Sequence, residues 1–108
     1  MFAKTSRGGY IPVSPGIVRK TLVFGDHTLM TEFLLEKGSN LASHRHPHEQ
    51  TGYLVSGHML LTIGEEKAEI RPGDSWTIPG DVSHHAEILA DSLTIEVFSP
   101  RRDEYLPQ

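Results

Sequence analysis

The chain has 108 residues, enough for one domain with a single modest hydrophobic core. A net charge of -4, counted with neutral histidines, argues against a nucleic-acid groove or an anionic membrane surface as a partner. The absence of cysteine excludes disulfides, thiolate zinc sites and cysteine nucleophiles. No stretch resembles a signal peptide or reaches the roughly 20 apolar residues of a membrane span, so we expect a cytoplasmic protein that binds no membrane.

Residues 1–16 contain three glycines and two prolines, which predicts an irregular or extended arm before one domain at residues 17–108. Beyond the arm, turn residues recur at short intervals. They separate runs rich in β-branched and aromatic residues at 17–24, 28–36, 50–56, 58–63, 75–79 and 92–98. Short strands with turns about every 8 to 12 residues are typical of an all-β sandwich or barrel. No segment keeps a helical period over about ten residues.

The stretch HRHPHEQ at residues 44–50 holds three of the seven histidines. Alternate residues of a strand share one face, so His44 and His46 are expected to project together. Pro47 should end that strand, because proline cannot donate to a sheet ladder. The chain can then return with Gln50 pointing to the same interior, and Gly52 on that face should leave open space beside it.

A further histidine, His84, follows two Pro-Gly-Asp turns. Three imidazoles and one side-chain oxygen, with coordination positions left open, are typical of a catalytic rather than a closed structural metal site. A solvated histidine-rich loop is the alternative interpretation. We expect His48 to lie in the turn and His85 to face away from His84.

Two longer patterns surround these residues. Gly-x5-His-Arg-His-x3-Gln-x6-Gly begins at residue 38, and Gly-x5-Pro-x-Asp-x2-His begins at residue 73. They match the two cupin motifs, with Gln50 in the usual glutamate position, so the chain resembles a small single-domain cupin. The resemblance implies an all-β double-stranded β-helix, which is a jelly-roll barrel. It also implies one divalent metal ion (Ni, Zn, Fe or Mn) held by His44, His46, Gln50 and His84.

A closer resemblance rests on HPHEQ, YLVSG and the ending EVFSPRRDEYL. These segments are similar to the KdgF-type cupins of pectin and alginate breakdown, which open 4,5-unsaturated uronate monosaccharides to a linear ketone form. The resemblance implies Glu96 and Arg102 as catalytic residues and Phe98 as a substrate-binding residue. Glu96 stands where that family typically has aspartate.

The run at residues 92–98 places Thr94, Glu96 and Phe98 on one face. The opposite interpretation turns that face to solvent and puts Leu93, Ile95 and Val97 in the core. The sequence leaves the orientation of two further positions undecided. Only one of the neighbours Arg19 and Lys20 can face inward, and Trp76 is expected either in the core or at a dimer interface.

We therefore predict a metal-dependent, non-redox sugar-acid enzyme that opens and tautomerises unsaturated uronates. A neutral amide ligand leaves the ion's full charge uncancelled, which favours binding of a small anionic substrate over oxygen activation. A quercetinase-like metal-dependent dioxygenase and a small-ligand-binding cupin without turnover are the alternatives. A homodimer is expected, because small barrels commonly pair their sheets.

Overall fold

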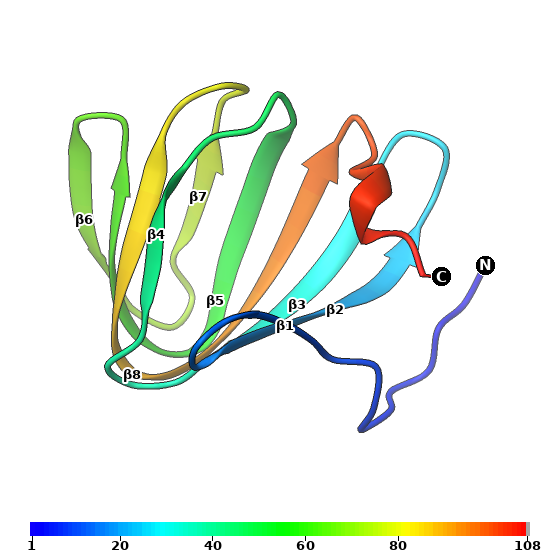
Figure 1. Cartoon of the computed structure of the whole chain (residues 1–108), viewed down its shortest axis with the longest axis horizontal. Coiled ribbons are helices and arrows are strands. Elements are labelled where there is room, and N and C mark those ends of the chain that lie inside the picture. Colours follow the sequence, from blue (N-terminus) through cyan, green and yellow to red (C-terminus); the bar gives the residue numbers. More distant parts are fainter. Residues whose placement is uncertain (108) are drawn as a thin grey trace.

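The computed structural model describes residues 1–107, and within that range eight strands form one antiparallel sheet. They are β1 (Ile11–Ser14), β2 (Ile17–Phe24), β3 (Leu29–Leu35), β4 (Asn40–His44), β5 (Glu49–Ile63), β6 (Glu66–Ile70), β7 (Ser75–Ile78) and β8 (His84–Ser99), followed by the 3-10 turn η1 (Asp103–Tyr105). The order is β1-β2-β3-β8-β5-β6, while β4 pairs with β8 and β7 with β5. The sheet folds over into two layers (Figure 1), which confirms the all-β jelly-roll prediction.

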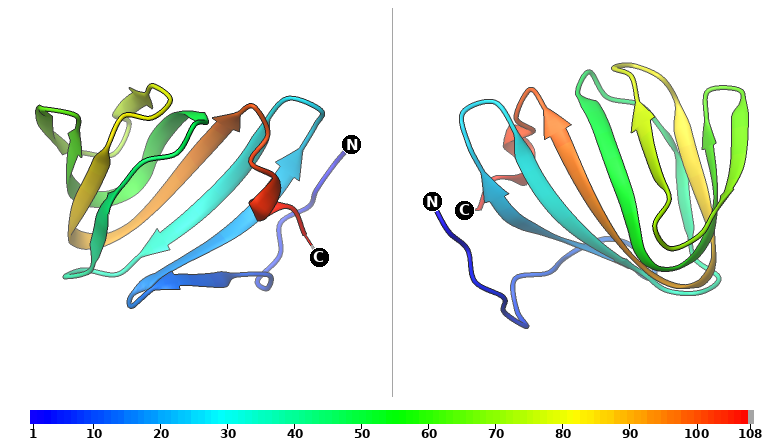
Figure 2. Two further views of the ribbon diagram at one scale, coloured as in Figure 1. Left: turned by 45° about the horizontal axis from the view of Figure 1, so that its top comes forward. Right: turned by 180° about the vertical axis from the view of Figure 1, so that it is seen from behind.

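The two longest strands, β5 and β8, connect the layers. They pair with each other along most of their length and bend together at one end of the barrel, as Figures 1 and 2 show from three directions. The second half of β8 pairs with β3 and its first half with β4. The runs 50–56 and 58–63 are therefore one bent strand rather than two, because Gly57 turns the chain with φ +106° and the pairing with β8 resumes beyond the irregular register at the bend.

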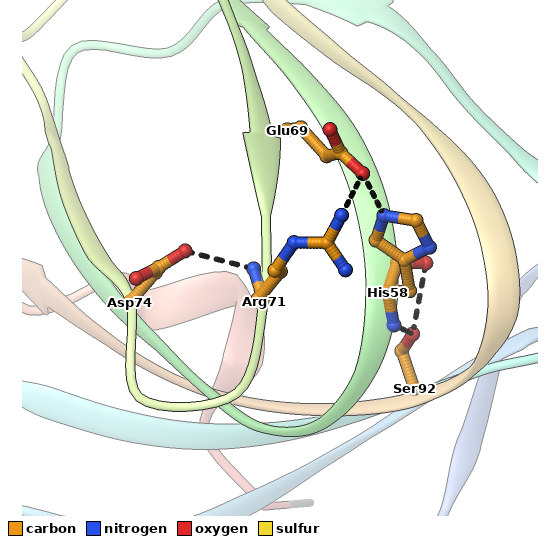
Figure 3. A network of polar contacts seen from close by, with 5 residues as sticks. All are labelled: His58, Glu69, Arg71, Asp74 and Ser92. Atoms are coloured by element: carbon orange, nitrogen blue, oxygen red, sulfur yellow. Dashed lines mark hydrogen bonds and ion pairs between the residues drawn. The ribbon is translucent and has the colours of Figure 1, made fainter.

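A polar network fixes this bend (Figure 3). The backbone N–H of His58 donates to Ser92 Oγ at 3.0 Å, and a Cβ on Gly57 would overlap that same oxygen. On the surface, Glu69 Oε1 accepts from His58 Nε2 at 2.7 Å and from an Arg71 guanidinium nitrogen at 2.6 Å. These contacts join β5 to β6 and β8 where the strands change direction.

The core lies between the two layers, where alternate residues of each strand point inward. Its buried members are Ile17, Phe33, Leu35, Leu54, Met59, Leu61, Ile70, Ala86 and Ile88. In the second half of β8 the buried residues include Thr94, Glu96 and Phe98, while Leu93, Ile95 and Val97 lie half-exposed on the outer face. The prediction that Glu96 and Phe98 face the interior is confirmed, and the opposite interpretation is wrong.

The N-terminal arm contributes a strand of its own. Residues 11–14 form β1, which pairs with β2 and so extends the edge of the chain's own sheet. Farther out, Lys20 Nζ donates to Ser6 Oγ at 2.7 Å and so holds the start of the arm against β2. None of the described residues belongs to a helix long and apolar enough to cross a membrane.

Candidate metal centre

Three histidines converge at the open end of the barrel. His44 ends β4, His46 lies in the following loop and His84 begins β8 opposite His44. Each offers a ring nitrogen, and these atoms all lie within 4.8 Å of one another. The expected grouping of His44 and His46 is present, but its expected cause is wrong. The strand ends at His44, so the loop rather than strand alternation brings His46 into place.

The tautomers of the three rings are set by the backbone. In each ring Nδ1 lies within hydrogen-bond distance of a backbone carbonyl oxygen. The pairs are His44 with Ala42 (2.8 Å), His46 with His48 (3.0 Å) and His84 with Val82 (2.9 Å). A carbonyl oxygen only accepts, so Nδ1 carries the proton and Nε2 keeps its lone pair. Backbone carbonyls of this kind fix the orientation of metal-ligating histidines.

Gln50, from the start of β5, supplies the oxygen. Its amide nitrogen donates to Glu96 Oε1, so its Oε1 atom is turned toward the histidines and lies 3.0 Å from His46 Nε2. Two lone pairs therefore face each other, which is unfavourable unless a cation lies between them. In addition, His84 Nε2 is buried and has no hydrogen-bond partner within residues 1–107. This donor set fits a divalent ion bound by three imidazoles and one amide oxygen.

The electrostatics favour the neutral, metal-binding form of the rings. Burial lowers the pKa of His84 to about 4, and burial together with the nearby charge of Arg102 lowers the pKa of His46. Both rings are therefore neutral at pH 7. Because the Gln50 side chain is neutral as well, an ion bound there would keep its full positive charge.

Glu96 lies directly behind Gln50 on β8, and its side chain is held by three donors. Oε1 accepts from the Gln50 amide and from Trp76 Nε1 at 3.3 Å, while Oε2 accepts from Thr94 Oγ1 at 3.3 Å. Burial raises the pKa of the Glu96 carboxyl, and the hydrogen bonds from these donors act in the opposite direction.

Trp76 reaches Glu96 from β7 because its neighbour on β5 is a glycine. Gly52 pairs with Trp76, and a Cβ built on Gly52 would overlap the indole ring. The open space that we expected beside Gly52 is therefore filled by tryptophan. Trp76 itself is half-buried and packs against the core.

The cluster opens into a cavity of about 320 Å³, whose walls include His44, Gln50, Glu96, Phe98, Arg102 and Tyr105. The Arg102 guanidinium carbon lies 5.0 Å from the Phe98 ring centroid and 4.1 Å from that of Tyr105, and its Nε donates to Glu104 at 2.6 Å. Of the seven residues expected at the site, His44, Gln50, Glu96, Phe98 and Arg102 line this cavity, and His46 and His84 are connected to it through the three-histidine group.

Two features of the site could not be predicted from the sequence: the presence of Tyr105, and which residue of the pair Arg19 and Lys20 faces inward. Tyr105 lines the cavity, yet its only signal is an aromatic residue in a polar C-terminal segment. Of the two neighbours on β2, Arg19 faces inward, with its guanidinium carbon 3.8 Å from the Tyr105 ring centroid. His48 lies in the loop and His85 is exposed, as expected, and neither belongs to the three-histidine group.

Comparison with known proteins gives consistent results. A cupin-domain model matches residues 31–99. KdgF from a Halomonas species has a TM-score of 0.91 and 33% identity, with 98% of each chain covered. An RmlC-like cupin from Shewanella frigidimarina has a TM-score of 0.90 and 25% identity, over 97% of this chain and 95% of that one. An uncharacterized protein of Methanocaldococcus jannaschii is 29% identical over an alignment of 87 positions, which covers 76% of this chain and 70% of that protein.

The matched range runs from β3 to the end of β8 and contains His44, His46, Gln50 and His84. The jelly-roll barrel, the convergent histidines and this match over more than half of the chain lead to one conclusion: the protein belongs to the cupin family.

Proposed function

We propose that the protein is a metal-dependent enzyme that opens 4,5-unsaturated uronate monosaccharides to their linear keto form. The observation that carries the proposal is the meeting of two groups of residues in one cavity. The first group is the metal-binding donors, of which His44 and Gln50 line the cavity while His46 and His84 cluster with them. The second group is Glu96, Phe98 and Arg102. The likeness to Halomonas KdgF over 98% of both chains supports the same reaction.

His44, His46, Gln50 and His84 hold the ion, which when bound supplies Lewis-acid binding of substrate oxygens. The reaction is an isomerisation, so protons are moved and none is gained. The hemiacetal hydroxyl loses a proton as the bond between its carbon and the ring oxygen breaks. The ring oxygen leaves as an enolate, which takes one proton on carbon and becomes the ketone.

We assign both proton transfers to Glu96. It lines the cavity, and its Oε1 atom is occupied by the Gln50 and Trp76 donors, while Oε2 has only the weaker contact from Thr94. Oε2 is therefore the atom that takes the hydroxyl proton and returns one to the carbon of the enolate.

Arg102 and Phe98 orient the sugar. The Arg102 guanidinium presents forked donors that polarise a substrate oxygen as negative charge develops on it. Phe98 is buried at the cavity wall beside His46, with ring centroids 5.6 Å apart, and packs against the sugar ring.

The test is an ultraviolet assay on metal-loaded protein. The substrate is unsaturated galacturonate or mannuronate made by a lyase, which absorbs through its conjugated double bond. We expect the absorbance to fall faster than the spontaneous rate, and His46→Ala and Glu96→Ala to abolish the acceleration. His85→Ala and Glu87→Ala are matched controls, because both residues are exposed on β8 and His85 lies outside the metal group.

Each outcome assigns a role. Acceleration that survives Glu96→Ala keeps the function and rejects Glu96 as the acid–base. No acceleration by fully loaded protein rejects the enzyme proposed here. Oxygen consumption then separates a metal-dependent dioxygenase from a cupin that binds its ligand without turnover.

A further inference from the structure

Arg19 lacks the carboxylate partner that three other arginines of the barrel have. Arg71, Arg101 and Arg102 each form an ion pair, with Glu69 (2.6 Å), Asp103 (2.8 Å) and Glu104 (2.6 Å). Arg19 has no carboxylate partner within residues 1–107. One of its terminal nitrogens, Nη1, is buried and has no hydrogen-bond acceptor in that range. Leaving a buried charged donor unpaired costs about 1–3 kcal/mol or more, so an acceptor from outside the chain is expected.

Arg19 lies beside two residues of the cavity wall. On β2 it lies two residues after Ile17, which is fully buried, and so shares the inward face. The ladder places it opposite Phe33 of β3, a cavity-lining residue. Its guanidinium rests on the ring of Tyr105, which lines the same cavity.

Ser14 adds a second unsatisfied group at this wall. It lines the cavity from β1, and its Oγ atom is buried without a partner among the described residues. The β1–β2 ladder pairs Ser14 with Ile17, which places it two residues from Arg19 along the inward face. A guanidinium and a hydroxyl are both hydrogen-bond donors, and both suit a carboxylate oxygen.

We propose that Arg19 and Ser14 form a carboxylate-binding subsite on the β1–β2 wall of the cavity. This inference rests on the proposed function and gives the sugar acid an orientation. Its carboxylate is bound by Arg19 and Ser14, while its reacting oxygens lie toward the histidines and Glu96. One ligand can reach both walls, because Ser14, His44 and Glu96 line the same cavity of about 320 Å³.

The experiment is titration calorimetry on the metal-loaded protein with two probes, D-galacturonate and its neutral methyl ester. The wild type should bind the acid at least about tenfold more tightly, as expected for a charge-assisted contact. Arg19→Met keeps the packing of the stem and should weaken galacturonate binding about tenfold or more, with little change for the ester. Ser14→Ala should have a smaller effect in the same direction.

Lys20→Met is the matched control. It removes the same charge one residue away, from a side chain that reaches Ser6 outside the cavity. If Lys20→Met and Arg19→Met weakened galacturonate binding equally, the effect would come from the overall positive charge rather than from a contact with Arg19. This result would overturn the subsite. Equal weakening of acid and ester by Arg19→Met would show that Arg19 only supports the Tyr105 wall, and this too overturns it. The subsite is also overturned if the wild type binds no galacturonate, or if it binds the acid and the ester equally well.

The ultraviolet assay keeps this inference separate from the proposed function. Binding of galacturonate that depends on Arg19, without turnover of the unsaturated sugar, would keep the subsite and reject the enzyme. Turnover whose KM is unchanged in Arg19→Met would keep the enzyme and reject the subsite.

Discussion

Gln50 joins Glu96 to the histidine cluster through the two ends of one amide. Its nitrogen donates to Glu96 Oε1, and its oxygen lies 3.0 Å from His46 Nε2. The hydrogen bond to Glu96 thus determines which amide atom the ion would meet. An amide is the side chain that meets both requirements, since it carries a donor and an acceptor on one planar group and adds no charge.

Gln50→Glu should therefore destabilise the metal-free protein. A glutamate cannot donate to Glu96, so two carboxylates would face each other in a buried position, and one of them must take up a proton. We expect a loss of about 2–3 kcal/mol in unfolding free energy at pH 7 and a smaller loss at pH 5. Urea denaturation at both pH values measures it, with the exposed neighbour Glu49→Gln as control. A loss that does not change with pH would contradict this explanation.

Gly52→Ala tests the packing of tryptophan beside the site. The new Cβ overlaps the Trp76 indole, so we expect destabilisation of about 1–3 kcal/mol from overpacking. Gly25→Ala, with nothing within 4 Å of its Cβ, should change stability by no more than about 0.5 kcal/mol. Trp76→Leu should recover part of the loss in the double variant, because residues in contact couple. If the losses of the two single variants simply added up in the double variant, as measured by denaturant titration, the new methyl group would not be clashing with Trp76.

The low pKa of His84 predicts acid sensitivity of the metal-free protein. The unfolded chain binds this proton near pH 6.5, whereas the folded protein resists it until about pH 4. Stability is therefore lost as the pH falls through that window, by about 3 kcal/mol between pH 7 and pH 4. Urea denaturation of chelator-treated protein should show a smaller decrease for His84→Gln. Equal slopes for the two proteins would reject His84 as the source.

The network at the bend contains a buried contact and a surface contact that can be compared. Ser92→Ala leaves the His58 amide without its acceptor, and Ser92 is only 5% exposed, so we expect a loss of about 1–3 kcal/mol. Glu69→Gln weakens a surface ion pair with Arg71 and a surface hydrogen bond with His58, and it should change stability by less than about 1 kcal/mol. Thermal unfolding of both variants measures the two losses. A larger loss for Glu69→Gln than for Ser92→Ala would show that the surface contacts are what stabilise the bend.

Much of the barrel followed from local pattern, because turn residues and period-two alternation carry the strand signal. The first half of β8 and all of β6 were missed, since their side chains are largely polar or small. A strand was expected at His44, but it was expected to run on to Pro47, whereas β4 ends at His44. The merging of two runs into β5 was missed because glycine signals a turn and a bend equally well. The homodimer stays a prediction.

At the site, the four metal-binding candidates could be chosen from spacing and motif. Glu96, Phe98 and Arg102 came from family resemblance, and their shared cavity depends on contacts between distant strands. Tyr105 and Arg19 could not be found in this way. They are 86 residues apart in the sequence and meet only because η1 folds back over β2.

The contact between Trp76 and Glu96 also has a spectroscopic consequence. Trp76 is the single tryptophan of the chain, and its indole N–H donates to the carboxylate that lines the cavity. All tryptophan fluorescence therefore arises next to the site. A ligand or ion that changes the charge or hydration around Glu96 should shift the emission, so the protein carries its own optical reporter of occupancy.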